Sequence, residues 1–293
     1  MKLACFDGGR IGVVSGDRIV DVTPAAGVDP ASWPPVGMVQ VIANFERLRA
    51  TFQHQLDAGG GKPLASVRLE CPIAWPNKVV AFPANYHAHI DEMKAGSGLI
   101  SNFAAAGQGF FLKANSSLSG PADPIVLPNL DGREVHHESE LAVIIGKRGR
   151  NIPRENALQH VFGYSCLIDA VVRGKEERVM RKSYDTFCPL GPWLVTAEEV
   201  PDPANIDIEL TVNGEVRQKA NTRALIVDVP EMIAMASSVM TLEPGDIIAS
   251  GTPSGVGPML PGDAVCITIA GVGEMRLNAV RGEGPVHPVW IKD

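Results

Sequence analysis

The sequence is short of the features that mark nucleic-acid-binding and membrane proteins. It has 26 Lys and Arg against 33 Asp and Glu among 293 residues, which gives a net charge of −7. Binding to a phosphate backbone requires clustered basic side chains, so this acidic balance disfavours nucleic acid as a partner. No apolar run approaches the ~20 residues that a membrane-spanning helix needs. We therefore expect neither a nucleic-acid partner nor a membrane partner.

Cysteine is scarce and shows no paired spacing. An odd number of scattered cysteines without a CxxC pair predicts neither a zinc knuckle nor a disulfide framework, and free buried thiols are typical of the reducing cytoplasm. The first residues, MKLACFDGG, also lack the apolar stretch of a secretion signal. We therefore expect a cytoplasmic location. The five cysteines are Cys5, Cys71, Cys166, Cys188 and Cys266.

Several common enzyme motifs are missing. No GxSxG elbow is present, which disfavours a serine hydrolase of the α/β type. No GxGxxG follows an apolar strand, which disfavours a dinucleotide enzyme. The glycine-rich stretch 251–257 lacks the lysine of a nucleotide-binding P-loop, so ATP binding is not expected.

Glycine and proline are abundant instead, with 30 and 23 residues. Together with short alternating apolar runs, they predict a β-rich α+β fold with many turns and few helices. Residues 1–22 read as a strand meander, and 38–57 show helical spacing that ends at three glycines. Pro72 and Pro76 then mark a boundary. We expect a small N-terminal subdomain over 1–72 and a main domain over 73–293.

Further elements are expected in the main domain. Residues 141–146 are uninterruptedly apolar, as in a strand buried on both faces. Alternation over 206–212 runs into Asn213-Gly214, a strong hairpin signal. Residues 230–239 predict a short amphipathic helix, and Val265, Ile267 and Ile269 should pair with Met275 and Leu277.

Two carboxylates stand two positions apart at the start of the buried strand. On a strand, Glu138 and Glu140 point to the same side with Cα atoms about 6.5–7 Å apart, and such like charges repel unless a cation lies between them. Asp169 is a charge inside an apolar run and needs a partner as well. Hard carboxylate oxygens favour Mg²⁺, Mn²⁺ or Ca²⁺. The alternative is that both glutamates simply form the solvated face of an edge strand.

Six segments, in order, resemble the fumarylacetoacetate hydrolase family. The resemblance implies a mixed β-sandwich or β-roll of that family's C-terminal domain type with a small N-terminal α+β subdomain, and a homodimer. It also implies that Glu138, Glu140 and Asp169 hold Mg²⁺ or Mn²⁺. The segments are residues 84–93, 110–128, 136–147, 182–196, 242–257 and 260–275.

The resemblance is not uniform. In residues 168–174 the family's polar neighbours are replaced by apolar residues, while Asp169 and Arg173 match. The following charged loop, up to Lys182, is shorter than in many members. These departures leave the metal ligands in place and affect the expected substrate contacts. They also keep open a metal-binding homologue without catalytic activity.

His89 and Glu92 are the candidates for proton transfer. Three residues apart, they share one face of a helix, and a carboxylate beside an imidazole fixes its tautomer and raises its basicity. The resemblance implies that such a pair activates water. Two alternatives remain: a surface salt bridge, or a zinc site built on His87-x-His89 of a strand. His136 and His137 are expected at a strand surface.

The remaining site candidates concern the substrate. Lys182 would supply fixed positive charge to a developing oxyanion, and Arg173 would pair with a carboxylate. The amides of the turn at Gly251 and the Thr252 hydroxyl would cradle a carboxylate, and the resemblance implies a substrate contact for this threonine. Tyr86 is a further candidate substrate contact.

Together these residues predict a metal-dependent hydrolase that cleaves a carbon–carbon bond. The expected substrate is a 1,3-dicarbonyl, 2-oxo carboxylic acid of the acylpyruvate or fumarylpyruvate type, from aromatic or sugar-acid catabolism. The same metal site also suits a 2-oxo acid decarboxylase, isomerase or hydratase. The segment 94–109, rich in hinge residues, is expected to form the lid.

Overall fold

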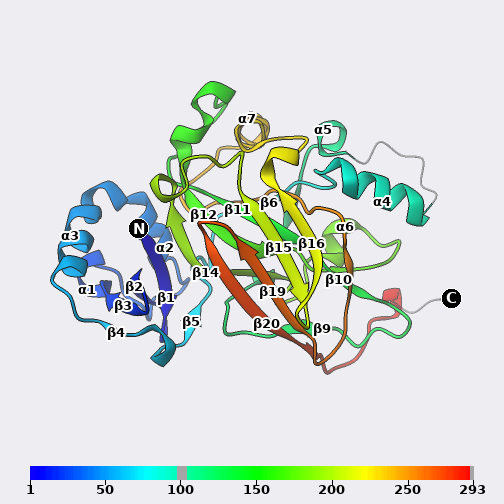
Figure 1. Ribbon diagram of the computed structural model, residues 1–293, viewed down its shortest axis with the longest axis horizontal. Helices are drawn as coiled ribbons and strands as arrows, with labels where there is room; N and C mark the ends of the chain where they lie inside the picture. The colour runs from blue at the N-terminus through cyan, green and yellow to red at the C-terminus, as the bar shows by residue number, and fades with distance from the viewer. Residues whose placement is uncertain (98–103, 291–293) are drawn as a thin grey trace.

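A large twisted sheet runs through the whole molecule and joins its N-terminal part to the rest (Figure 1). The computed structural model describes residues 1–97 and 104–290. In spatial order this sheet comprises β4 (Lys62–Pro63), β3 (Arg18–Asp21), β2 (Arg10–Ser15), β1 (Lys2–Phe6), β14 (Cys188–Thr196), β12 (Val161–Ile168), β11 (Ser139–Ile145), β17 (Ile247–Ala249), β6 (Val79–Ala81) and β7 (Phe111–Lys113), with β5 (Leu69–Glu70) beside β1 and β8 (Leu118–Ser119) beside β14.

A second sheet packs against the middle of the large one, and a small third sheet lies beside the site described below. The second sheet carries the two predicted hairpins, and the pairing of Val265 with Leu277 and of Ile267 with Met275 is confirmed. Its strands are β16 (Glu215–Asn221), β15 (Asp207–Val212), β19 (Ala264–Ile269), β20 (Gly273–Arg281) and β9 (Ile125–Leu127). The small sheet consists of β13 (Val171–Val172), β10 (Val135–His137) and β18 (Gly257–Met259).

The predicted buried strand is confirmed as β11, and its two faces serve two cores. Leu141, Val143 and Ile145 pack into the core shared with the second sheet. The alternate residues Ala142 and Ile144 pack into the core beneath the N-terminal helices. Because side chains alternate along a strand, both faces must be apolar when both are covered, which explains the uninterrupted run.

Helices contribute to the cores on both faces of the large sheet, those of the N-terminal part on one face and the helix after Pro230 on the other. The single helix predicted over 38–57 is divided at Asn44, which leaves helical backbone angles while its side-chain amide donates to the Gln40 carbonyl at 2.8 Å. The predicted helix after Pro230 is confirmed, and Asp228 caps it by accepting from the Glu231 amide. The helices are α1 (Thr23–Ala26), α2 (Gly37–Ala43), α3 (Phe45–Asp57), α4 (His87–Ser97), α5 (Ala105–Gln108), α6 (Arg178–Arg181) and α7 (Val229–Val239).

The N-terminal meander is confirmed, and its first strand is continuous with the main sheet. Lys2 pairs with Val195 and Leu3 with Leu194, so β1 lies directly against β14. Helices α1, α2 and α3 gather around this meander at one end of the molecule (Figure 1). The backbone hydrogen bonds between β1 and β14 therefore connect the predicted 1–72 unit to the remainder of the protein.

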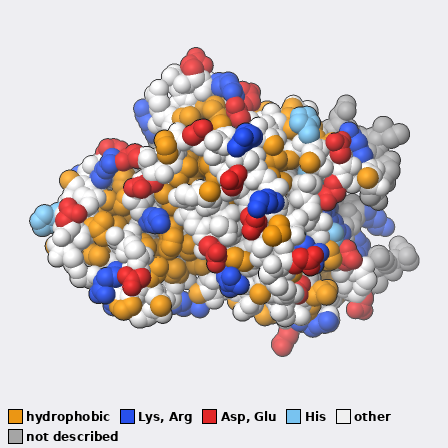
Figure 2. All heavy atoms as spheres, in the orientation of Figure 1, with side chains coloured by type: hydrophobic (Ala, Val, Ile, Leu, Met, Phe, Trp, Pro, Cys, Tyr) orange, Lys and Arg blue, Asp and Glu red, His pale blue; other side chains and the backbone are white. Residues whose placement is uncertain are grey.

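Three further observations concern the surface, the cysteines and the helices. Acidic and basic side chains are interspersed over the face drawn in Figure 2. All five cysteines lie in the described chain, and each is free and buried. Among the helices of residues 1–97 and 104–290, none has the length and apolar character of a membrane span.

Candidate active site

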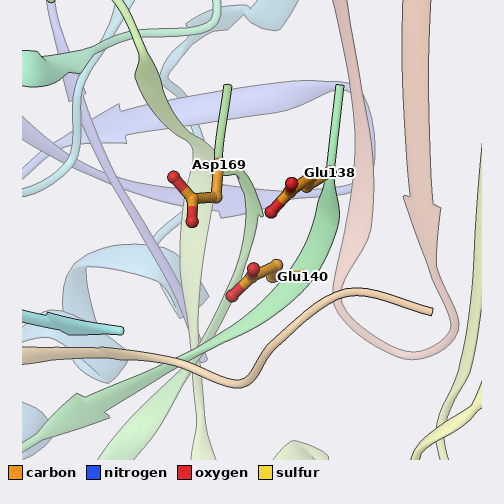
Figure 3. A group of neighbouring side chains, drawn as sticks. All are labelled: Glu138, Glu140 and Asp169. Atoms are coloured by element: carbon orange, nitrogen blue, oxygen red, sulfur yellow. The ribbon is translucent and has the colours of Figure 1, made fainter. Parts of the chain in front are cut away.

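Three buried carboxylates converge where the small sheet meets the large one. Glu138 lies at the bend between β10 and β11, Glu140 lies in β11, and Asp169 follows the end of β12. The three side chains are neighbours (Figure 3), and one ligand oxygen from each lies within 4.8 Å of the others. The Asp169 amide donates to the Glu138 carbonyl at 2.8 Å and ties the two strand ends together.

Two buried lysines contact this cluster from one side. Lys182 donates to Glu138 at 2.8 Å and also to Asp169. Lys113, at the end of β7, donates to the other oxygen of Asp169 at 2.5 Å and to the carbonyls of Lys182 and Phe187. Sequence reasoning identified Lys182 and missed Lys113. The available signal was a charge that ends the apolar run FFLK.

Burial and neighbouring charges shift the pKa values of Glu138, Glu140 and Lys182 in different directions. Burial would raise the pKa of Glu138, but the charges of Lys182 and Arg173 outweigh it and hold that pKa at about 2. Burial and the neighbouring Asp169 charge raise the pKa of Glu140 well above its ordinary value. Burial opposes the charged form of Lys182, but the charges of Asp169 and Glu138 prevail and raise its pKa.

The donor set fits a hard divalent cation. Glu140 is 1% exposed and accepts the Gly251 amide at 2.8 Å, but no described residue forms an ion pair with it. A buried carboxylate without a cation is costly, and oxygen ligands alone select Mg²⁺, Mn²⁺ or Ca²⁺ over metals that prefer sulfur. Glu138, Glu140 and Asp169 are thus the residues that would hold the metal.

His89 and Glu92 face this cluster from α4. The Nδ1 atom of His89 lies 3.0 Å from the Glu92 carboxylate, whose second oxygen accepts the Gly255 amide at 2.9 Å. His89 is buried, whereas His87 is exposed on the same helix. The predicted alternative of a zinc site on a strand is wrong in its geometry, because residues two apart on a helix do not share a face.

Arg173 and the two neighbouring histidines lie beside Glu138. Arg173 donates through Nε to His136 at 2.9 Å, and its guanidinium lies 3.8 Å from Glu138. The expectation that both histidines are surface residues is wrong for His137, which is 1% exposed and contacts Gln218. The pKa of His137 is lowered to about 4, mainly by burial, so this ring is neutral near pH 7.

Gln218 is a second residue that sequence reasoning missed. This buried β16 side chain accepts the Ser139 amide and donates to the Thr252 hydroxyl and the Pro253 carbonyl. It therefore links the strand of the carboxylates to the glycine-rich turn. On the sequence it sits in an ordinary polar run, VRQKAN, with nothing to set it apart.

Of the other expected substrate contacts, Thr252, Gly251 and Tyr86, only one has its side chain in the lining of the cavity described below. Thr252 lines the cavity over the carboxylates. The Gly251 amide is already engaged by Glu140, so it supports the cluster directly. Tyr86 is buried beside the cavity and is not part of its lining. Burial, and to a lesser extent the Glu140 charge, raise the pKa of its phenol.

A cavity of about 560 Å³ opens above the carboxylates. Its walls include α4, with His89, Glu92 and Lys94, and the α6 segment, with Arg178 and Arg181. Of the expected lid over 94–109, α4 and α5 contribute the described parts, and residues 98–103 lie outside the described residues.

Replacing Lys113 by Met should destabilise the metal-free protein by about 3–5 kcal/mol, because Lys182 alone then remains as the buried lysine beside three buried carboxylates. Saturating Mn²⁺ should recover part of that loss, since a bound cation replaces the missing charge. Thermal unfolding with and without Mn²⁺ measures both effects. Equal unfolding temperatures for the metal-free variant and the unchanged protein would contradict the role assigned to Lys113. Lys219→Met, at an exposed ion pair with Glu209, is the control.

Comparison with known proteins gives a consistent result. The profile described as "Fumarylacetoacetate (FAA) hydrolase C-terminal" matches residues 78–280. Maleylpyruvate hydrolase of Aquipseudomonas alcaligenes is 46% identical over 283 residues, covering 94% of this chain and 98% of that protein.

Solved structures extend this likeness to the fold. The crystal structure of maleylpyruvate hydrolase from Sphingobium sp. SYK-6, in complex with manganese(II) ion and pyruvate, is 55% identical, with a TM-score of 0.88 over 97% of this chain and 100% of that one. The structure of 2-hydroxyhepta-2,4-diene-1,7-dioate isomerase from Mycobacterium marinum is 38% identical, with a TM-score of 0.66 over 77% of this chain and 82% of that one.

Proposed function

The chain belongs to the fumarylacetoacetate hydrolase family, and from that membership we propose that it is a divalent-metal-dependent hydrolase that cleaves a carbon–carbon bond in maleylpyruvate. It is an acylpyruvate hydrolase of aromatic catabolism. The observation that carries the proposal is the buried Glu138–Glu140–Asp169 cluster beneath the His89–Glu92 pair, in a chain that matches maleylpyruvate hydrolases over nearly its full length.

We propose Mn²⁺ or Mg²⁺ as the metal, held by Glu138, Glu140 and Asp169. The oxygen-only donor set suits both ions, and the Sphingobium relative holds manganese(II). When bound, the cation supplies Lewis-acid polarisation of the oxygens at the oxo acid end of the substrate.

His89 would take the proton that makes water a nucleophile. Glu92 holds the Nδ1 side of the ring, which leaves Nε2 to accept a proton from water in the cavity. The water oxygen bonds to the carbonyl carbon farther from the carboxylate of the oxo acid. The bond from that carbon to the neighbouring methylene carbon then breaks. Its electron pair stays with the pyruvate fragment as an enolate, which is protonated on carbon to give pyruvate and a second carboxylic acid.

The lysines would stabilise the negative charge that develops during this cleavage. The Lys182 ammonium is buried and lies directly beside Glu138 and Asp169, so it acts in a site of low dielectric, where its charge has a large effect. Lys113 fixes the position of Asp169 and the backbone carbonyl of Lys182. Arg173, beside Glu138, is placed to pair with the carboxylate of the oxo acid end.

Isomerisation is the second candidate, favoured by the likeness to the Mycobacterium marinum isomerase. That likeness is weaker, at 38% identity over 77% of this chain, than the 55% identity over 97% for the maleylpyruvate hydrolase. The two named compounds share a feature, since each carries a carboxylate at both ends. The higher identity makes hydrolysis the better supported reaction. The names of both relatives point to a dicarboxylate substrate.

An assay of the purified protein with maleylpyruvate and Mn²⁺ tests the function. We expect stoichiometric release of pyruvate, measured by coupling to lactate dehydrogenase, and loss of turnover after chelation of the metal. Consumption of the substrate chromophore without pyruvate release would indicate isomerisation. An unchanged substrate spectrum at saturating Mn²⁺ would overturn the proposal.

We also propose that the protein is a cytoplasmic homodimer and that residues 1–72 form a small subdomain. Five free buried thiols are in keeping with a reducing compartment, and a homodimer is the state that the family resemblance implies. The buried residues Ala4, Phe6, Val14 and Ile19 form a small cluster within this segment, which supports the subdomain.

A further inference from the structure

We propose that Arg178 binds the carboxylate at the far end of the substrate and so selects dicarboxylate acylpyruvates over monocarboxylate ones. This inference rests on the proposed function and deepens it. The proposed chemistry uses the carboxylate cluster, His89 and Lys182 at the oxo acid end of the substrate. It leaves unassigned two cations on the α6 wall of the same cavity, Arg178 and Arg181.

The position of Arg178 places it at the outer part of the cavity. Its guanidinium carbon lies 5.3 Å from the centroid of the Phe111 ring, and the Lys182 ammonium lies 5.6 Å from the same centroid. Lys182 is buried against the carboxylates, whereas Arg178 is half-buried. One aromatic ring thus adjoins both an inner cation at the reacting end and an outer cation, so a substrate lying along Phe111 reaches both.

Arg178 also has unused capacity for an anion. Its guanidinium donates to the Gln108 side-chain oxygen at 2.9 Å, and it forms no ion pair within residues 1–97 and 104–290. The acidic residues nearby are already engaged. Glu176 pairs with Arg133 at 2.6 Å, and Glu177 accepts the amide of Arg178 itself.

Neighbouring arginines reinforce this positive end. Arg181 donates to the backbone carbonyls of Glu176 and Val172, and no described carboxylate forms an ion pair with it. Burial and the charges of Arg173 and Arg178 lower the pKa of Arg181, so the three cations repel one another. A far carboxylate between Arg178 and Arg181 relieves the repulsion between these two cations, and the guanidinium fork matches the two oxygens of a carboxylate. Arg173, beside Glu138, stays with the carboxylate of the oxo acid end.

A matched pair of uncleavable probes isolates the effect of the far carboxylate. Both 2-oxopimelate and 2-oxoheptanoate have the oxo acid end and the same chain length, lack the second carbonyl needed for cleavage, and differ by the terminal carboxylate. Calorimetric titration of the Mn²⁺-loaded protein should show about tenfold to a hundredfold tighter binding of 2-oxopimelate, the range expected for a charge-assisted hydrogen bond. Arg178→Gln should abolish that preference without weakening 2-oxoheptanoate binding.

Control variants separate local pairing from general charge. Lys175→Gln removes the same charge three residues before Arg178, at an exposed position outside the cavity lining, and it should keep the preference. Arg178→Lys keeps the positive charge but lacks the planar guanidinium fork, so this variant should keep only part of the preference for 2-oxopimelate. The inference would be overturned if Arg178→Gln kept the full preference for 2-oxopimelate, or if Lys175→Gln lost as much of that preference as Arg178→Gln.

Kinetics distinguish failure of the inference from failure of the proposed function. With the unchanged protein active, Arg178→Gln should raise KM for maleylpyruvate by about tenfold or more and leave acetylpyruvate, which lacks the far carboxylate, unaffected. Equal effects on both substrates would refute the role of Arg178. Inactivity of the unchanged protein on both would refute the function, while the binding of the uncleavable pair would still decide the inference.

Discussion

Replacing Glu140 by Gln should remove Mn²⁺ binding at micromolar concentrations and lower kcat/KM for maleylpyruvate on the order of a thousandfold. Of the three carboxylates, Glu140 is the one that forms no ion pair with a described residue. The substitution keeps the shape of the side chain and removes the charge that a metal would neutralise. Mn²⁺ titration by electron paramagnetic resonance and steady-state kinetics measure the two effects.

Stability separates this result from misfolding. Burial of an unpaired carboxylate is costly, so the metal-free Glu140→Gln protein should unfold at the same temperature as the unchanged protein or at a higher one. Glu215→Gln, at an exposed position of β16, should leave metal binding and activity intact. Full activity of Glu140→Gln at saturating Mn²⁺ would refute the assignment of this residue to the metal.

Replacing His89 by Ala should lower kcat by about a hundredfold to ten-thousandfold, the usual contribution of a positioned general base. His89 is buried beside the cavity, and Glu92 holds its Nδ1 atom, so no exposed histidine of α4 substitutes for it. Affinity for Mn²⁺ should change by no more than about threefold, because the cluster consists of carboxylates. Single-turnover kinetics and metal titration provide the two readouts.

The helix supplies a matched control for that experiment. His87 belongs to the same helix, two residues earlier, and is exposed to solvent. His87→Ala should therefore leave turnover and metal affinity unchanged. A loss in His87→Ala as large as in His89→Ala would indicate that the variants disturb α4 rather than remove a proton acceptor.

Local patterns predicted much of the fold because they report burial directly. The uninterrupted apolar run of β11 identified a strand covered on both faces, and the Asn213-Gly214 pair identified a tight turn because both residues adopt positive φ there. The division of the predicted 38–57 helix at Asn44 was missed. Apolar spacing continues across that residue, while a side-chain hydrogen bond to the preceding turn interrupts the helix.

The proposed metal ligands were predictable from sequence because neighbouring or buried carboxylates require a positively charged partner. Glu138 and Glu140 show this requirement through their two-residue spacing on a strand and Asp169 through its place inside an apolar run, and the family resemblance joins the three. By contrast, the sequence did not show that β10 and β11 belong to different sheets, with Glu138 at the bend between them. Strand periodicity describes only one continuous strand, so it contains no information about such a change of direction.

What the sequence determined by itself was therefore the chemical character of the site: hard oxygen ligands, a histidine with a carboxylate partner, and a lysine near both. Only the tertiary structure decided which further residues join them. Lys113, Gln218 and Arg178 come from three elements far apart in the chain, and each is an ordinary polar residue within its own segment. Their roles arise from distances set by strand pairing and packing between sheets, and residue spacing along one segment does not encode those distances.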